Sequence, residues 1–214
     1  MKKIEKIAEP ILEQVERWLK DADHKLKLVI GIEGYSAVGK TTLHEYLRQQ
    51  LPDLLQVRLD DYLAKRAVRD AIRSEANWQL DWKKSGWYQY EEFERVINAY
   101  RRSDAKFTSQ IYNRDTDDYD RTVEYDLSKP AMLLEGSLLF RSPAGPEIDR
   151  LIYLDGSWDE ADRRRLKRHI AVRGDNYQTR ERSRIFERNF RILYEKYLKK
   201  YDVRARTDLT IHVD

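Results

Sequence analysis

Residues 28–51 read LVIGIEGYSAVGKTTLHEYLRQQL, and this stretch decides the fold. It starts as a short apolar run, passes through glycines to a lysine and two threonines, and ends in a helical pattern. Residues 34–41 fit the pattern G-x-x-x-x-G-K-[ST]. Glycines let a backbone curl so that successive N–H groups point at phosphate oxygens, and a helix that begins there adds its partial positive charge. A buried strand before the loop and a helix after it are the context that this motif requires.

The loop predicts a site for the phosphates of a nucleoside triphosphate. A strand-to-helix turn without a ligand is the alternative, but the lysine and the threonine stand in register between suitable flanks. We expect Lys40 to project into solvent-filled space above the loop and to reach the β- and γ-phosphates, and the Thr41 hydroxyl to ligate Mg²⁺. The predicted nucleotide-binding residues are Gly34, Tyr35, Ser36, Ala37, Val38, Gly39, Lys40, Thr41 and Thr42.

Strands and helices alternate on both sides of this loop. Apolar runs predict strands at 27–32, 54–63, 131–136, 150–155 and 209–213, and two strands around a polar turn within 106–125. Apolar residues at helical spacing predict helices at 3–20, 41–51, 64–76, 91–102, 158–172 and 178–200. This alternation predicts an α/β fold with a mostly parallel five-stranded sheet flanked by helices. We expect a single domain over residues 1–214, with an N-terminal helix inside 1–26.

The composition limits the classes of protein to consider. Of the 214 residues, 41% are hydrophobic and 37% are charged, which suits a globular domain with a heavily charged surface. Lys and Arg number 41 against 38 Asp and Glu, so overall charge argues against nucleic acid as a partner. The absence of cysteine excludes disulfides and thiolate metal sites. The charged N-terminus and the lack of a long apolar run predict a cytoplasmic protein without a membrane partner.

Acidic residues stand where two of the predicted strands end. Asp60 and Asp61 close the second strand, and Glu135 follows the apolar run at 131–134. Asp60 could accept the proton of a substrate hydroxyl that attacks the γ-phosphate, and Glu135 could hold Mg²⁺. Asp61, next along an extended chain, should point to the opposite face. Helix capping by the aspartates and an exposed loop acid at 135 are the alternatives.

The helix predicted at 158–172 and the residue after it carry a dense group of basic side chains. They are Arg163, Arg164, Arg165, Lys167, Arg168 and Arg173. Most such runs form a solvated face, and a nucleic-acid patch is a second alternative. In phosphoryl transfer, however, arginines from a closing lid stabilise the charge on the transferred group.

Four motifs together resemble the uridine kinase, nicotinamide riboside kinase, phosphoribulokinase and pantothenate kinase group of P-loop kinases. GIEGYSAVGKTTL (31–43) is similar to the opening G-x-x-G-x-x-x-x-GKTTL, and LDDYL (59–63) to the D-x-F/Y signature of that group. LLEGSLLF (133–140) resembles its EG-x-L-L-F segment. RRLKRHIAVRG (164–174) resembles its lid pattern R-R-x-x-R-D-x-x-x-R-G, although His169 stands where uridine kinases carry Asp. The resemblance runs from about Leu28 to at least Gly174.

The resemblance implies a P-loop NTPase fold and a kinase that uses ATP and Mg²⁺. The first aspartate of the signature is then the base and a metal partner. The catalytic residues implied are Asp60, Lys40, Arg168 and Arg173, and the metal residues are Thr41, Asp60 and Glu135. Among the other cations of the lid, Arg164 is the second choice, and we expect Arg163, Arg165 and Lys167 at the surface.

The acceptor side is expected within residues 77–125, with residues 158–177 as the lid. Related kinases cover their acceptor with a β-hairpin, and GWYQYEEF (86–93) looks like a stretch of nicotinamide riboside kinases. A water-exposed turn is the alternative for the hairpin. Trp78, Trp82 and Trp87 could stack on a ring, although core packing is the commoner fate of tryptophan. The predicted substrate-binding residues are Asp61, Tyr62, Tyr88, Tyr112, Arg114, Tyr119 and Arg121.

The sequence therefore favours an ATP-dependent kinase that phosphorylates a hydroxyl of a small metabolite, with a nucleoside or riboside as the leading acceptor. A kinase of a non-nucleoside acceptor is one alternative. A regulatory ATPase that uses the loop only to bind nucleotide is another. Asp60 and the hairpin favour the kinase, because a switch needs no acceptor pocket. Homo-oligomerisation stays open.

Overall fold

The computed structural model describes residues 3–22, 27–74, 86–142 and 145–213. The helices are α1 (Lys3–Asp21), α2 (Lys40–Gln50), α3 (Arg66–Ser74), α5 (Tyr90–Arg101), α6 (Trp158–Arg173) and α7 (Tyr177–Lys200). The strands are β1 (Leu28–Gly34), β2 (Leu55–Arg58), β3 (Lys106–Asn113), β4 (Asp118–Asp126), β5 (Ala131–Glu135), β6 (Arg150–Gly156) and β7 (Leu209–Val213). Short 3₁₀ turns lie at Leu59–Tyr62, Leu139–Arg141 and Gly145–Glu147.

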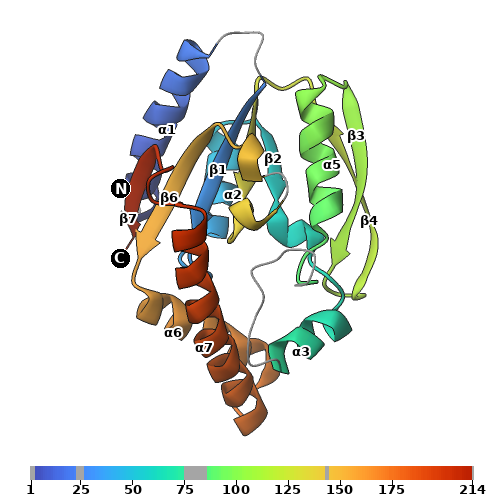
Figure 1. Cartoon of the computed structure of the whole chain (residues 1–214), viewed down its shortest axis with the longest axis vertical. Coiled ribbons are helices and arrows are strands. Elements are labelled where there is room, and N and C mark those ends of the chain that lie inside the picture. Colours follow the sequence, from blue (N-terminus) through green and yellow to red (C-terminus); the bar gives the residue numbers. More distant parts are fainter. Residues whose placement is uncertain (1–2, 23–26, 75–85, 143–144, 214) are drawn as a thin grey trace.

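Five of the described strands form a parallel sheet in the order β2-β5-β1-β6-β7 (Figure 1). The predicted α/β fold is therefore confirmed, and the sheet is parallel throughout its described pairs. All seven residues of β1 are buried, as expected for a central strand covered on both faces. Because the strands are parallel, the loops that follow β1, β2 and β5 all leave from the same edge of the sheet.

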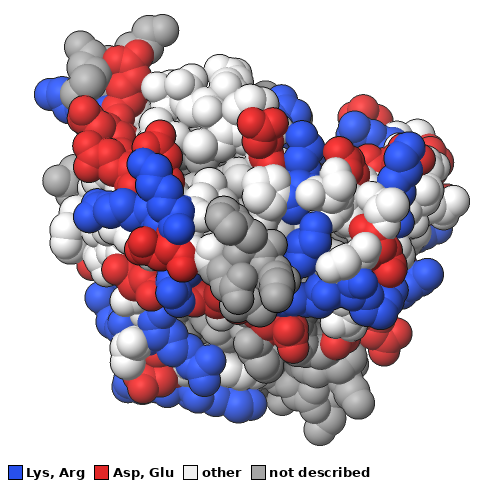
Figure 2. Space-filling view, turned by 90° about the horizontal axis from the view of Figure 1, so that it is seen from above, with Lys and Arg blue, Asp and Glu red and all other residues white. Residues whose placement is uncertain are grey.

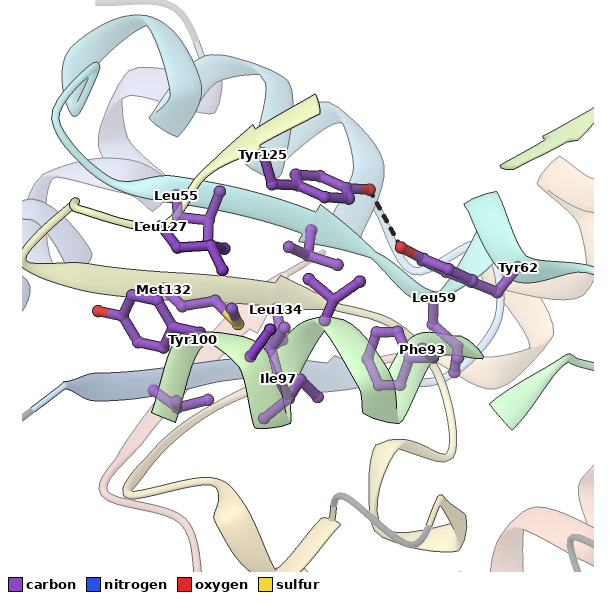
Figure 3. Packing of buried hydrophobic residues seen from close by; sticks show 14 of the residues in the cluster. Leu55, Leu59, Tyr62, Phe93, Ile97, Tyr100, Tyr125, Leu127, Met132 and Leu134 are labelled. Carbon is purple, nitrogen blue, oxygen red and sulfur yellow. Dashed lines mark hydrogen bonds between the residues drawn. The ribbon is translucent and has the colours of Figure 1, made fainter. Parts of the chain in front are cut away.

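Two faces of the sheet bury separate hydrophobic clusters. Along β1, Ile30 and Ile32 pack toward α1 and α2, whereas Val29 packs toward α5 and the hairpin of β3 and β4. This alternation follows from the period of two in a strand. Figure 3 shows the cluster on the α5 side of the sheet, in which Phe93 and Ile97 of α5 lie against the sheet. A third cluster packs α6 and α7 against β6, on the same face of the sheet as α5.

The second strand differs from its prediction. β2 ends at Arg58, and Leu59–Tyr62 form a 3₁₀ turn instead of continuing the strand. Leu59 and Tyr62 stand three residues apart and are both buried, so one turn of 3₁₀ helix anchors both side chains in the core. Figure 3 shows the Tyr62 ring in that core, with its hydroxyl hydrogen-bonded to that of Tyr125 at 3.2 Å.

The other predicted elements appear close to their expected bounds. The hairpin predicted within 106–125 is present as β3 and β4. The helix predicted at 64–76 is α3, which is described as far as Ser74. Trp78, Trp82 and most of the loop predicted at 77–90 lie outside the described residues.

None of the helices in the described ranges combines the length and the apolar character that crossing a bilayer would require. Figure 2 shows the face seen from above, where basic and acidic side chains lie among one another. That mixture agrees with the small formal net charge of +3.

Candidate active site

The loop between β1 and α2 has the backbone geometry of a phosphate cradle. A Cβ on Gly34 would lie 2.8 Å from the carbonyl oxygen of Leu154, so only glycine allows β1 and β6 to approach here. Gly39 has a φ of 120°, a conformation that favours glycine. No side chain caps the N-terminus of α2. Its first N–H groups are thus left for a ligand, and the helix dipole favours an anionic one.

Lys40, the first residue of α2, lies folded back over the loop. Its Nζ donates hydrogen bonds to the carbonyl oxygens of Gly34 at 2.9 Å and Tyr35 at 3.0 Å, and to Ser137 Oγ at 2.8 Å. The residue is 5% exposed, so the expectation that its amine projects into solvent-filled space is wrong for this structure. Burial lowers the pKa of the amine, and the charge of Glu135 opposes that shift.

Asp60 faces the loop from the 3₁₀ turn after β2. Its carboxylate accepts a hydrogen bond from the Tyr88 hydroxyl at 3.2 Å and pairs with the Arg114 guanidinium at 3.0 Å. Tyr88 precedes α5 and Arg114 follows β3, so two separate segments orient one carboxylate. A base must reach the proton it removes, and Asp60 is held beside open space.

Glu135 ends β5 next to Lys40 and has the properties of a metal ligand. Its Oε2 is buried without a hydrogen-bond partner among the described residues, and Arg58 Nε lies 3.7 Å away. Burial raises the pKa of Glu135 to about 7, while Lys40 lowers it. With Thr41 and Asp60 it offers the oxygen donors that Mg²⁺ prefers, and Mg²⁺ keeps several waters or phosphate oxygens besides protein ligands. The residues present therefore fit a magnesium ion.

These groups line one cavity of about 1070 Å³. A pocket for a single small ligand spans roughly 300–1,000 Å³, so this volume suits a nucleotide donor together with an acceptor. The cavity extends from the loop and Lys40, past Asp60, to α3 and the hairpin. The predicted residues that line it are Ser36, Ala37, Gly39, Lys40, Thr41, Thr42, Asp60, Tyr88, Tyr112, Arg114, Glu135, Arg168 and Arg173.

The arginine-rich helix α6 also borders the cavity. Arg168 and Arg173 both line the cavity and are exposed. Arg164, the second choice, also lines the cavity. Arg165, by contrast, was expected at the surface but is 4% exposed. It pairs with Asp162 and lies over the Phe186 ring of α7, so it joins the two helices.

His169 joins the same pair of helices from the cavity side. Its Nδ1 lies 3.0 Å from Ser183 Oγ, and the residue lines the cavity. The position at which this chain departs from the uridine kinase pattern is thus occupied by a side chain that bonds across to α7.

A further part of the cavity lining comes from α3 and the hairpin. The Tyr112 hydroxyl donates to Asp117 at 2.7 Å and accepts from Arg69 at 2.6 Å. Tyr119 does not line the cavity; its hydroxyl donates to the carbonyl oxygen of Leu63 at 3.2 Å. Tyr119 thus ties the hairpin to the chain after β2.

Other predicted residues lie outside the cavity lining. Tyr62 belongs to the hydrophobic core, which gives no support to a role in substrate binding. Asp61 does not line the cavity, and burial raises its pKa while Arg58 opposes that shift. Arg121 is exposed on β4.

Within the loop between β1 and α2, the ring of Tyr35 is buried and stacks on Trp158, with ring centroids 4.8 Å apart. Gly34 and Val38 do not line the cavity, and the Val38 side chain belongs to the hydrophobic core.

Sequence reasoning missed several residues of the site. Ser137, which accepts a hydrogen bond from Lys40, stands two positions after Glu135 and could have been noticed from that spacing. Arg66 and Arg69 line the cavity from α3, but arginines on an amphipathic helix give no signal of their own. Glu33 is fully buried beside the loop, where an acid at the end of an apolar run was the one available sign.

Phosphate loops serve many nucleotide-dependent proteins, so the loop alone does not define the class. A cavity that continues past the loop to a second binding region, with a carboxylate between the two, is the arrangement of a phosphotransferase. The fold and the site together therefore define a P-loop kinase that acts on a small metabolite.

The model of the Phosphoribulokinase / Uridine kinase family matches residues 29–213, and the chain belongs to this family. Nicotinamide riboside kinase 1 from Mus musculus is 27% identical over 143 residues, which are 66% of this chain and 67% of that protein. The match therefore spans about two thirds of each chain.

Solved structures share the fold at low sequence identity. A possible uridine kinase from Bacillus stearothermophilus superposes with a TM-score of 0.63 at 20% identity, covering 94% of this chain and 99% of that chain. D-glycerate 3-kinase from Cryptococcus neoformans gives a TM-score of 0.62 at 13% identity, covering 92% and 90%. Membership in the family implies ATP as phosphate donor and Mg²⁺ as its partner.

Proposed function

We propose that the protein transfers the γ-phosphate of ATP to a hydroxyl of a nucleoside or riboside. The observation that carries this proposal is the position of Asp60. Its carboxylate lines the same cavity as Lys40 and is oriented by Tyr88 and Arg114, which come from segments on the acceptor side. The relation to nicotinamide riboside kinase 1 supports a riboside as the acceptor class.

In this proposal the loop N–H groups and Lys40 bind the phosphates of the donor. Asp60 accepts the proton of the acceptor hydroxyl, because a carboxylate beside the attacking oxygen can take a proton as the bond to phosphorus forms. Tyr88 and Arg114 orient Asp60 toward that oxygen. Thr41 and Glu135, with Asp60 near them, would hold Mg²⁺, which when bound neutralises charge on the phosphate oxygens.

The lid arginines complete the proposed site. Arg168 and Arg173 border the cavity from α6, where their guanidinium groups can approach the transferred phosphoryl group. Charge spreads over its equatorial oxygens during transfer, so fixed cations at this point lower the barrier. Tyr112 and Arg69 remain at the far end of the cavity to contact the acceptor.

A substrate panel tests the proposal. The purified protein is incubated with Mg·ATP and one acceptor at a time, and formation of ADP is followed. The acceptors are uridine, cytidine, adenosine, nicotinamide riboside, pantothenate, D-glycerate and a set of free sugars. We expect ADP formation to depend on a nucleoside or riboside, with the phosphorylated product identified by mass.

Two results would contradict the proposal in different ways. ADP formation at the same rate without any acceptor would indicate an ATPase instead. Stimulation by pantothenate, D-glycerate or a sugar alone would keep the kinase and replace the acceptor class. The Lys40→Met variant provides the background rate.

A further inference from the structure

One buried carboxylate outside the cavity connects the segments that surround Lys40. Glu33, near the end of β1, has no exposed surface and does not line the cavity. Its Oε1 accepts hydrogen bonds from the backbone N–H groups of Gly34 at 2.9 Å and Leu138 at 3.1 Å. Its Oε2 accepts one from the N–H of Leu139 at 2.8 Å. The carboxylate therefore bonds both the start of the phosphate loop and the turn after β5.

Two tyrosines of α7 hold the same carboxylate from the other side. The Tyr197 hydroxyl donates to Oε2 at 2.7 Å, and the Tyr194 hydroxyl lies 3.3 Å from Oε1. Tyr197 also accepts a hydrogen bond from the N–H of Phe140 at 3.1 Å. Glu33 is thus fixed in position and joins β1, the turn at 138–140 and α7.

The segments that Glu33 holds are those that supply the partners of Lys40. The amine bonds the carbonyl oxygens of Gly34 and Tyr35 and the hydroxyl of Ser137. Ser137 also donates to the Gly34 carbonyl at 2.9 Å. The next residue, Leu138, has a φ of 69°, which a leucine adopts only when its surroundings compel it. Its hydrogen bond to Glu33 is one such constraint.

The chemistry of these bonds requires a carboxylate. Three of the five partners are backbone N–H groups, which can only donate. An ionised carboxylate accepts at both oxygens, whereas an amide of the same shape would turn its NH₂ group toward at least one of these N–H groups. Burial raises the pKa of Glu33, but the charge of Lys40 and the hydrogen bonds to Leu139, Tyr197 and Gly34 oppose that shift. Both carboxylate oxygens of Glu33 therefore accept hydrogen bonds, which is what a buried polar group requires.

We propose that Glu33 is a positioning residue that shapes the surroundings of Lys40 and thereby sets the affinity of the loop for the β- and γ-phosphates. This inference rests on the phosphate-binding role proposed for Lys40. Glu33 itself does not line the cavity. It acts by holding Gly34 and the turn that carries Ser137 in one arrangement.

A pair of nucleotides separates this role from a general effect on folding. Mg·AMPPNP, a non-hydrolysable ATP analogue, has the β- and γ-phosphates that Lys40 contacts, whereas AMP has neither. We expect the Glu33→Gln variant to bind Mg·AMPPNP at least about tenfold more weakly than the wild type, and AMP within about twofold, by calorimetry. Asp149→Asn is the matched control, because Asp149 accepts the N–H of Val29 at 2.7 Å at the opposite end of β1. It should leave both affinities unchanged.

Each result decides the inference. Unchanged binding of Mg·AMPPNP by a folded Glu33→Gln variant would overturn it, as would an equal loss for both nucleotides. A wild-type protein that binds no Mg·AMPPNP would overturn the proposed function, and this inference with it.

If Glu33→Gln does not fold, Tyr197→Phe replaces it in the same experiment. This variant keeps the ring and removes one donor to Glu33, so about threefold weaker binding of Mg·AMPPNP with unchanged AMP binding is expected. An unchanged ratio of the two affinities would overturn the inference.

Discussion

At the scale of the residue, the site depends on a lysine that is already bound by the protein. Lys40 donates three hydrogen bonds within the structure. Its side chain is therefore held in place beside the loop by the protein's own acceptors. Because an ammonium group has three donors, a phosphate oxygen must replace at least one of these hydrogen bonds when it binds Lys40.

Replacing Lys40 with Met should abolish turnover without unfolding the protein. Methionine fills a similar volume and carries no charge, so the buried position tolerates it while the phosphates lose their cation. We expect kcat/KM for ATP to fall by at least about 10²-fold, with a cooperative thermal transition retained. Lys167→Met, an exposed lysine at the cavity rim, is the control. Kinetics close to wild type in Lys40→Met would refute the nucleotide site.

The two adjacent aspartates should differ in their importance. In a 3₁₀ turn consecutive side chains are about 120° apart, so Asp60 faces the cavity while Asp61 lies away from its lining. Asp60→Asn should retain Mg·ATP binding and lower acceptor phosphorylation by roughly 10²–10⁴-fold. Asp61→Asn should lower it by less than about tenfold. Initial rates with saturating acceptor measure both, and the reverse order would assign the base to Asp61.

A buried histidine, His44, should make the free energy of unfolding depend on pH. His44 is 2% exposed, and burial lowers its pKa to about 4 from the usual 6.5. Below pH 6.5 the unfolded chain takes up a proton that the folded chain does not, so stability falls as the pH drops from 6.5 to 4. The full difference corresponds to roughly 3 kcal/mol.

Comparison of the wild type with His44→Gln isolates this contribution. The free energy of unfolding, measured by denaturant titration across the same pH range, should fall more steeply for the wild type. The exposed His212, replaced in the same way, provides the control. Parallel pH profiles for wild type and His44→Gln would contradict the assignment.

The site residues that could be proposed from the sequence are those that belong to a local sequence pattern. Lys40 and Thr41 follow from the spacing of the loop. Asp60 lines the cavity, but the expectation that Asp61 points away from it along an extended strand is replaced by the geometry of the 3₁₀ turn. The role proposed for Glu33 depends on hydrogen-bond partners more than 100 positions away in the sequence, such as Leu138 and Tyr197. No local sequence pattern predicts such contacts.

At the scale of the element, hydrogen bonds between α6 and α7 hold the helix that carries Arg168 and Arg173, the two arginines proposed for a lid. Asp162 of α6 accepts hydrogen bonds from Arg191 of α7 at 2.6 and 2.8 Å, and lies 3.3 Å from the Tyr35 hydroxyl. The tip of the pair is different, because Val172 and Tyr177 are 82% and 75% exposed. The N-terminal part of α6 is thus connected to the loop between β1 and α2, whereas the residues where α6 ends and α7 begins are exposed.

Removing either lid arginine should slow the reaction without loosening the fold. Arg168 and Arg173 are exposed, so Arg168→Ala and Arg173→Ala should leave the thermal midpoint nearly unchanged. Each should lower kcat on the order of 10³-fold if it stabilises the transferred phosphoryl group. Arg163→Ala is the control, since this arginine pairs with Glu160 and does not line the cavity. If all three variants had the same kcat, the arginines of α6 would have no role in phosphoryl transfer and would form only a solvated basic face.

Elements were predictable where hydrophobic periodicity was strong. The strands at 131–135 and 150–156 and the long helix α7 appear within a few residues of their expected positions. The end of β2 was missed, because Leu59 and Tyr62 suit a strand as well as a turn until the core behind them is known. Arg165 was assigned to the surface because nothing near it in sequence indicates Phe186, the ring that it covers.

At the scale of the whole molecule, the cavity draws its lining from segments that are far apart in the sequence, between Ser36 and Leu193. Residues of α2, α3, α6 and α7 contribute, together with the ends of β3 and β5. A ligand bound there would contact several segments at once, in addition to the direct hydrogen bonds between them, such as Arg69 to Tyr112. Binding should therefore stabilise the fold as a unit.

We expect Mg·ADP at a hundred times its dissociation constant to add about 2.7 kcal/mol to the free energy of unfolding. For a chain of this size that corresponds to a rise in Tm of roughly 5–10 °C. Thermal scans with increasing Mg·ADP measure the shift, and Lys40→Met should show a smaller one at the same concentration. No shift in the wild type at saturating nucleotide would contradict a site built from these elements.

The central place of β1 has a consequence for the chain during its synthesis. The two strands that hold β1 in register, Ala131–Glu135 and Arg150–Gly156, are synthesised more than 90 residues after the loop sequence. Such distant pairing delays folding until the later segments are available. A nascent chain therefore carries the complete phosphate-binding motif before it has a sheet on which to shape it.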